Sequence, residues 1–310
     1  MFRDSIRRRD FLQAGAAAGL ATAFAPSALA ATPTRYDPAA KFDLAVSELE
    51  YRRTAKGRAL LARIYQPTGP GPFPVVLSLH GGAWNAKDRS AEDPFNRAIA
   101  ASGALVVAVD LTLAPESPYP ACVQDASYAL RWLKAKAKTW NGDASRIGVF
   151  GSSSGGHVAE LLAMRPRDAR YNALAFNGAA SPDYVLMRSP ISNTFARFET
   201  AQANKVDAMI KNNTTFFVPW ETIHESNPQE ILERKEKVAL KPFLIMQGAL
   251  DSNMLPVYQT KFVEAYRAAG GPCDYTIFEG CEHEWVAKPG PATTRAHEMA
   301  KAFIARQVST

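Results

Sequence analysis

The sequence predicts an α/β fold, with a mostly parallel eight-stranded sheet flanked by helices. Three observations support this prediction. Short β-rich segments alternate with helical ones from about residue 41, several β-rich segments are continuously apolar, and 47% of the 310 residues are apolar. Continuous apolar runs are typical of strands that helices cover on both faces of a parallel sheet. The alternation itself indicates βαβ units, so we expect one domain over residues 41–310.

The predicted strands and helices follow from local composition, taken in chain order. The strands are expected at Leu44–Tyr51, Leu60–Tyr65, Val75–Leu79, Leu105–Val109, Ile147–Phe150, Leu174–Asn177, Phe243–Gln247 and Tyr275–Phe278. The helices are expected at Asp93–Ala101, Ala121–Lys138, Gly156–Met164, Pro256–Ala269 and Thr293–Gln307. The first two strands are less apolar than the others, so we expect them to form an antiparallel edge.

Residues 181–240 interrupt the alternation between two predicted core strands. The segment contains four prolines among aromatic and polar residues. A connection this long in a compact domain usually has a function. We interpret it as a mostly helical insertion that forms a lid or a wall of the substrate pocket. The alternative is a surface excursion with no role in binding.

Residues 1–30 have the features of an export signal. Basic residues 7–9 precede a small-residue apolar run from Ala14 to Ala25, and Ala28–Ala30 has the small-x-small pattern of a cleavage site. Residues 8–12 (RRDFL) resemble the bacterial twin-arginine signal, although Arg7 and Gln13 depart from its usual pattern. The apolar run is shorter than the roughly 20 residues of a membrane span. We therefore predict a periplasmic or secreted protein without stable membrane insertion.

Charge and cysteine content exclude other classes. The signal segment supplies two of the six net positive charges, which leaves +4 spread over the remaining chain. This charge is too small to indicate a nucleic-acid partner. Three cysteines form no disulfide framework. Cys273 and Cys281 flank a predicted strand, which would hold them about 26 Å apart if extended, whereas bridged Cα atoms lie within about 7 Å.

The most informative motif is GSSSG at residues 151–155. It has the form G-x-S-x-G and lies between a predicted strand and a predicted helix, which is the context of a nucleophilic serine. The sharp turn needs small residues two positions before and after the nucleophile. Of the three serines, only Ser153 has glycine at both positions. Ser153 is therefore the predicted nucleophile.

A second motif, HGGAW, follows the predicted strand Val75–Leu79. A glycine-rich loop at this place can supply backbone N–H groups to an oxyanion. We predict an oxyanion hole from Gly81, Gly82, Ala83 and Ser154, with the N–H groups of the last three as donors. The alternative for the Gly-Gly pair is a simple turn.

The predicted acid and base follow the serine in the order acid, then histidine. Asp251 comes just after the strand Phe243–Gln247, and His283 comes just after the last strand. The other four histidines do not follow a late core strand. Asp274 and Glu279 are the competing acids; Asp274 lies at the wrong end of its strand, and Glu279 is close to His283 along the chain.

These motifs resemble the hormone-sensitive-lipase-like branch of the α/β-hydrolases, which contains bacterial carboxylesterases and acetyl esterases. The resemblance covers most of residues 60–305. Residues 110–121 (DLTLAPESPYPA) are similar to the family stretch D-Y-R-L-A-P-E-x-P-F-P-A, and residues 151–157 resemble its nucleophile motif, which usually has Ala in place of Ser154.

The sequence also departs from the family pattern. Ala83 replaces the third glycine of the oxyanion motif, and H-G-G-x-W is also an arylformamidase pattern. About 49 residues between the cleavage site and His80 leave little room for the usual N-terminal cap, so the insertion would form more of the pocket.

We therefore predict a serine carboxylesterase that acts on a small-molecule ester through an acyl-enzyme. Small or aromatic acyl and alkyl esters are the candidates, including carbohydrate acetyl and feruloyl-type esters. No cofactor or metal is expected, because no His, Asp or Cys cluster has ligand spacing. Trp84 and Trp285 are candidate substrate-binding residues, with core packing as the alternative. The competing functions are an arylformamidase-like amidase, a prolyl-oligopeptidase-like peptidase and a non-catalytic binding protein on a hydrolase scaffold, and the oligomeric state is left open.

Overall fold

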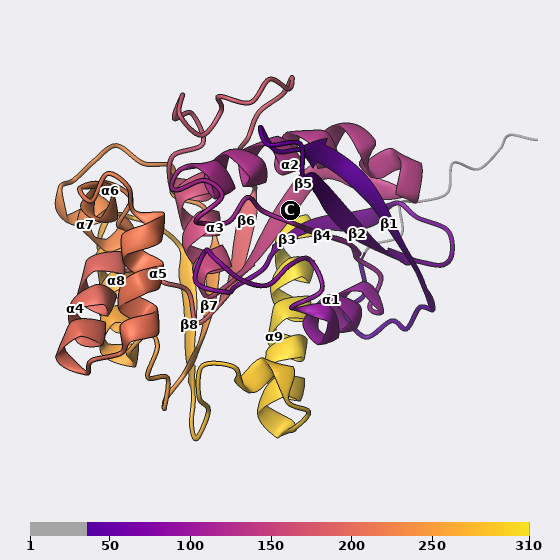
Figure 1. Cartoon of the computed structure of the whole chain (residues 1–310). Helices are drawn as coiled ribbons and strands as arrows, with labels where there is room; N and C mark the ends of the chain where they lie inside the picture. Colours follow the sequence, from indigo (N-terminus) through magenta and orange to yellow (C-terminus); the bar gives the residue numbers. More distant parts are fainter. Residues whose placement is uncertain (1–35, 310) are drawn as a thin grey trace, which may run out of the picture. The chain divides into compact units, whose positions relative to one another are not determined.

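The computed structural model describes residues 36–309, and this part of the chain forms one eight-stranded sheet. Its strands are β1 (Leu44–Arg53), β2 (Ala59–Pro67), β3 (Phe73–Leu79), β4 (Leu105–Val109), β5 (Gly142–Ser152), β6 (Tyr184–Arg188), β7 (Phe243–Gly248) and β8 (Cys273–Phe278). They lie side by side in the order β1-β2-β4-β3-β5-β6-β7-β8 (Figure 1). β2 pairs antiparallel with β1 and with β4, and the pairs from β4 to β8 are parallel. The predicted fold class and the antiparallel edge are confirmed.

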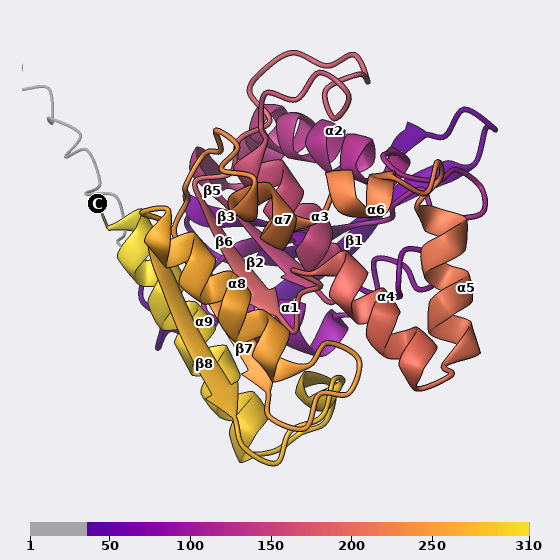
Figure 2. The same cartoon turned by 90° about the vertical axis from the view of Figure 1, so that its left-hand side faces the viewer.

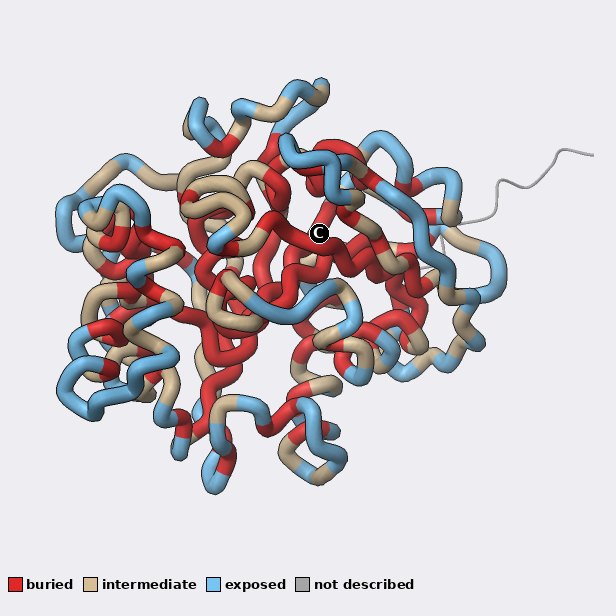
Figure 3. The backbone as a smooth tube through the Cα atoms, viewed as in Figure 1, coloured by how far each residue is buried: buried red, intermediate tan, exposed pale blue. Residues whose placement is uncertain are grey.

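Helices cover both faces of this sheet. They are α1 (Asp93–Ala100), α2 (Ala121–Lys136), α3 (Ser154–Met164), α4 (Thr194–Ala203), α5 (Asp207–Phe216), α6 (Thr222–Glu225), α7 (Pro228–Glu233), α8 (Pro256–Ala268) and α9 (Pro291–Val308), with short 3₁₀ helices at Ala137–Trp140 and Trp285–Ala287. Alternate residues of a strand point to opposite faces. Val75 and Leu77 of β3 pack in one hydrophobic cluster with α2, α3 and α8, whereas Val76 packs in a second cluster with α1 and α9. Figure 3 colours the backbone by burial, and the buried residues accordingly lie in the middle of the picture, between the exposed loops.

The position predicted for the sixth strand is wrong. The predicted strand Leu174–Asn177 is a loop, and the sixth strand is β6, whose five residues are all buried. The loop needs no strand partner at this point, because the Arg131 side chain of α2 donates hydrogen bonds to the carbonyl groups of Leu174 (2.9 Å) and Phe176. The predicted insertion over residues 181–240 therefore includes a core strand, and its helical part begins after β6.

The helices α4 to α7 occupy the connection between β6 and β7, and they pack into the protein core. They are grouped with α8 on the left of Figure 1, whereas Figure 2 shows α8 beside β7 and β8 and α4 and α5 further away on the right. Phe198, Phe216 and Ile223 belong to the same hydrophobic cluster as α2 and α3. The Tyr119 N–H donates to the Phe216 carbonyl at 2.9 Å. This segment is thus held to the core by buried contacts.

The described residues contain no helix that is both long enough and apolar enough to span a bilayer. The predicted export signal at residues 1–30 and its cleavage site lie outside the described residues.

Candidate active site

Ser153 lies at the turn between β5 and α3. Its φ of 52° and ψ of −117° are unusual for a residue other than glycine, so the turn holds the serine in a strained conformation. A Cβ atom on Gly151 would lie 2.5 Å from the Gly155 carbonyl oxygen, and one on Gly155 would lie 2.3 Å from the Leu79 carbonyl oxygen. Only glycine fits at these two positions, which is the physical basis of the G-x-S-x-G pattern.

Ser153, His283 and Asp251 form a continuous chain of hydrogen bonds. His283 Nε2 lies 2.9 Å from Ser153 Oγ, and His283 Nδ1 lies 2.9 and 2.8 Å from the two carboxylate oxygens of Asp251. Because Nδ1 faces a carboxylate, it carries the ring proton as a donor, and Nε2 accepts from the serine hydroxyl. This is the geometry of a Ser-His-Asp triad. The three side chains come from loops after β5, β7 and β8, at the carboxyl edge of the sheet.

Asp251 is buried, with an exposed fraction of 1%. Its Oδ1 accepts the N–H groups of Asn253 and Met254, each at 2.9 Å, and its Oδ2 accepts the Gln247 side-chain amide at 2.9 Å. Burial alone would raise the pKa of Asp251, but the hydrogen bonds and charge of His283 and the Met254 N–H outweigh it and hold that pKa below the usual value. The carboxylate is therefore ionised at neutral pH and fixes the histidine tautomer.

The two competing acids do not contact His283. Asp274 pairs with Arg306 at the outer strand β8, and Glu279 is exposed. The geometry thus favours Asp251, as the order of motifs along the chain predicted.

The HGGAW loop lies directly beside Ser153. A Cβ on Gly81 would be 3.2 Å from the Ser153 Cβ, and the Trp84 N–H donates to Ser154 Oγ at 3.2 Å. At Gly82 a Cβ would lie only 2.1 Å from the Ala86 carbonyl oxygen, and φ is 107°, so this position requires glycine.

Three N–H groups of this region are free to bind an oxyanion. Among the described residues, the backbone N–H groups of Gly82, Ala83 and Ser154 have no hydrogen-bond partner. Ser154 is the first residue of α3, where the helix itself leaves the N–H unpaired. Ala83 adopts φ 52°, the conformation that glycine would adopt without strain. Ala83 therefore occupies a backbone conformation that a third glycine could also adopt.

The two candidate substrate-binding tryptophans are both part of the core. Trp84 is 2% exposed; its ring stacks on Phe216 with centroids 4.7 Å apart, and its Nε1 donates to His157 Nδ1 at 3.2 Å. Trp285 is 6% exposed and stacks on Phe278 in the cluster that contains α1 and α9. Burial leaves either ring almost no surface for a substrate, so the geometry favours the alternative of core packing.

Arg188, the last residue of β6, is a residue of the site that sequence reasoning missed. It is 1% exposed, and its guanidinium donates to the His283 carbonyl and to Ser152 Oγ. The same group pairs with Glu92 at 3.3 Å and with Glu284 at 3.5 Å. The Arg188 carbonyl also accepts the Ser153 N–H at 2.9 Å. One residue therefore connects the serine turn to the histidine loop.

The apolar run YVLM before Arg188 could have indicated this strand. Those residues fall within the predicted insertion, residues 181–240.

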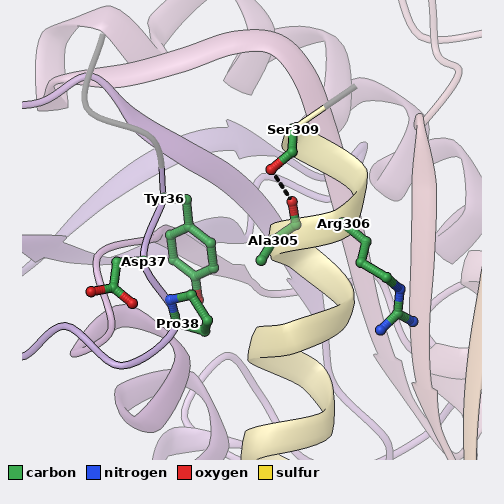
Figure 4. A pocket seen from close by; sticks show the side chains of 6 residues that line it. All are labelled: Tyr36, Asp37, Pro38, Ala305, Arg306 and Ser309. Carbon is green, nitrogen blue, oxygen red and sulfur yellow. Dashed lines mark hydrogen bonds between the residues drawn. The ribbon is translucent and has the colours of Figure 1, made fainter. Parts of the chain in front are cut away.

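A separate surface cavity of about 390 Å³ contains none of these residues. It lies between the start of the described chain and the end of α9, where Tyr36 and Pro38 face Ala305, while the Arg306 side chain points away from them (Figure 4). Within residues 36–309, no three His, Cys, Asp or Glu side chains gather into a metal-binding group.

Comparison with known proteins identifies the family. A family model described as alpha/beta hydrolase fold matches residues 76–287. Carboxylesterase NlhH of Mycobacterium tuberculosis is 42% identical over 116 residues, which cover 37% of this chain and 36% of that protein. An AB hydrolase superfamily protein of Schizosaccharomyces pombe is 37% identical over 242 residues, which cover 73% of this chain and 68% of that protein. The alignment thus spans about a third of the length of the mycobacterial relative.

Solved structures share the fold at low sequence identity. Esterase B of Lactobacillus rhamnosis superposes with a TM-score of 0.73 at 18% identity, over 87% of this chain and 90% of that one. An esterase of Pyrobaculum calidifontis gives a TM-score of 0.69 at 23% identity, over 86% of each chain. With the family match and the S. pombe relative, the chain belongs to the α/β-hydrolases, in their hormone-sensitive-lipase-like branch.

Proposed function

We propose that this protein is a serine carboxylesterase, with Ser153 as nucleophile, His283 as base and Asp251 as the supporting acid. The observation that carries the proposal is the unbroken hydrogen-bond chain from Ser153 Oγ through the His283 ring to Asp251. The carboxylesterase and esterase names of similar proteins support an ester as the substrate. Small and aromatic esters are the proposed substrates.

The first stage of the reaction forms an acyl-enzyme. His283 Nε2 takes the hydroxyl proton as Ser153 Oγ attacks the carbonyl carbon of the ester. The negative charge that develops on the carbonyl oxygen is stabilised by the free N–H groups of Gly82, Ala83 and Ser154. When the tetrahedral intermediate collapses, the C–O bond to the alcohol breaks, and the alcohol leaves with the proton from Nε2.

The second stage releases the acid. Water enters, gives a proton to His283 Nε2 and attacks the acyl carbon. The bond to Ser153 Oγ then breaks, and the serine recovers its proton from the imidazolium. Throughout both stages, Asp251 keeps Nδ1 protonated and stabilises the transient charge of the ring.

Activity measurements on Ser153→Ala test the assignment. Loss of a triad nucleophile costs about 10⁶-fold in kcat, so hydrolysis of 4-nitrophenyl esters should fall to background. A fluorophosphonate probe should label Ser153 in the wild type and in Ser152→Ala, but not in Ser153→Ala. Labelling of another residue, or retention of more than a few per cent of the rate in Ser153→Ala, would show that the nucleophile is misassigned.

A substrate panel separates ester from amide hydrolysis. The panel contains 4-nitrophenyl esters of increasing acyl length together with N-formyl aromatic amines. Higher kcat/KM on the N-formyl compounds would replace the carboxylesterase proposal by an arylformamidase-like activity of the same triad.

A further inference from the structure

Two arginines, Arg188 and Arg197, are the largest side chains that the described residues bury completely. Their surroundings differ. Arg188 has two carboxylates, a carbonyl and a hydroxyl as partners. Arg197, on α4, has one neutral partner: its Nε donates to Asn253 Oδ1 at 2.9 Å. Its Nη1 is enclosed and has no hydrogen-bond partner, and Nη2 has none among the described residues.

The Arg197 guanidinium lies beside the two loops that flank Ser153. Its central carbon is 5.7 Å from the centroid of the Trp84 ring, in the oxyanion loop. Its partner Asn253 belongs to the acid loop and donates its own N–H to Asp251. Asp251 forms no hydrogen bond with Arg197, because its carboxylate oxygens bind His283, two backbone N–H groups and the Gln247 amide. Its negative charge still acts on Arg197 and raises the pKa of the guanidinium.

Within the described part of the chain, Arg197 has no carboxylate in hydrogen-bond contact, and the negative charge of Asp251 acts on it without direct contact. His157 packs against the same Trp84 ring, and burial lowers the pKa of His157 to about 4, so it is neutral. Burial lowers the pKa of Arg197 to about 10, and the charge of Asp251 opposes that shift. Arg197 is therefore cationic at neutral pH. A contact with an aromatic face offsets only part of the cost of removing such a charge from water.

We propose that Arg197 binds a carboxylate group of the substrate, so that the preferred substrates are esters carrying a negative charge. This inference rests on the proposed esterase function and specifies its substrate class. A guanidinium presents its two Nη groups as a fork that matches the two oxygens of a carboxylate. Both Nη groups of Arg197 lack a protein partner, and α4 places them next to the loops that hold the reacting carbonyl. A substrate carboxylate would supply the hydrogen-bond acceptors that both Nη groups lack.

Matched substrate pairs test the proposal with the full chain. On the acyl side, mono-4-nitrophenyl glutarate is compared with 4-nitrophenyl pentanoate, which has the same length without the carboxylate. On the alcohol side, 3-carboxyphenyl acetate is compared with 3-methylphenyl acetate. The wild type should prefer the charged member of at least one pair in kcat/KM by about tenfold or more, the size expected of one charge-assisted hydrogen bond. Equal or lower kcat/KM for the charged member in both pairs would overturn the proposal.

Variants show whether Arg197 causes the preference. Arg197→Met should lower the charged-to-neutral ratio by about tenfold or more, mainly through KM, and Arg197→Lys should retain part of it. Lys211→Met is the matched control, because it removes one positive charge from an exposed position of the same segment; it should leave the ratio unchanged. A ratio that is the same in Arg197→Met and the wild type would mean that Arg197 only positions the Asn253 loop.

Two further measurements distinguish a lower charged-to-neutral ratio from a folding defect or a general loss of activity. Removal of a buried charge relieves the cost of keeping it out of water, and methionine keeps an unbranched side chain, so Arg197→Met should melt at the wild-type temperature or higher. A fall of more than about 10 °C would indicate a structural role and refute the proposal. If the wild type hydrolyses no ester, the esterase function fails. Binding of glutarate and benzoate, measured by thermal shift on wild type and Arg197→Met, then still decides the role of Arg197.

Discussion

Replacement of Arg188 by methionine should separate stability from catalysis. The change keeps an unbranched side chain but removes the donors to the His283 carbonyl and Ser152 Oγ. It also leaves Glu92, whose side chain is 7% exposed, without its 3.3 Å partner. Glu284 is less affected, because it is half exposed and pairs with Lys87 at 3.0 Å. The main energetic consequence is therefore an unpaired carboxylate at Glu92.

The expected loss of stability follows from that geometry. Removal of one partner from a buried ion pair costs about 3–5 kcal/mol, because the other charge stays buried. The double variant Arg188→Met/Glu92→Gln no longer contains the unpaired charge and should recover most of this free energy. The catalytic effect should persist in both variants. A shift of about 1 Å in a catalytic group can cost 10²-fold in rate, and the His283 loop has lost its anchor in both proteins.

Urea unfolding and steady-state kinetics on a neutral 4-nitrophenyl ester measure the two effects separately. We expect a destabilised single variant, a double variant with nearly wild-type stability, and kcat lowered about ten- to a hundredfold in both. If kcat returned to the wild-type value in the double variant, Arg188 would act through stability alone, and its positioning role would be refuted.

Three further predictions follow. Asp251→Asn should keep the fold but lower kcat about 10⁴-fold, because an amide favours the wrong histidine tautomer; a larger loss in Glu279→Gln at matched stability would assign the acid elsewhere. Burial raises the pKa of Glu160 to about 8, so the folded state favours the neutral carboxyl group. The wild type therefore has its full stability below pH about 4.5 and loses stability as the pH rises to about 8, because the unfolded chain ionises first. Glu160→Gln should therefore gain up to about 5 kcal/mol over the wild type at pH 9 and little at pH 4.5, measured by urea unfolding. We also propose export by the twin-arginine route: Arg8→Lys/Arg9→Lys should keep an uncut, active precursor in the cytosol, and normal export of this variant in a fractionation experiment would indicate another route.

Sequence patterns predicted the parts of the site that depend on local geometry. The turn at Ser153 needs glycines at fixed spacing, and the loop at Gly82 needs a positive φ. Both requirements are visible in the sequence as glycines. Asp251 and His283 were found because parallel strands end at one edge of the sheet, where their following loops meet.

The missed features depend on distant partners. Arg188 ends a buried strand inside the predicted insertion. Its charge is balanced by Glu92, which lies 96 positions earlier in the chain. The apolar segment Leu174–Asn177 looks like a strand, but Arg131 binds its carbonyl groups as a loop. Trp84 follows the catalytic loop directly and was therefore assigned to the pocket, although Phe216, more than a hundred positions later, covers its ring. No short sequence window contains these pairings.

The connection between β6 and β7 limits how this enzyme scaffold can be altered. The two strands are parallel neighbours, so the chain that leaves the carboxyl edge after Arg188 must return to the opposite edge before Phe243. Helices α4 to α7 make that return, and α4 also holds Arg197. Excision of the segment would therefore remove an obligatory crossover together with Arg197. Grafting from a relative should exchange the whole stretch between the two strands, whereas single substitutions on α4 can retune substrate choice without rerouting the backbone.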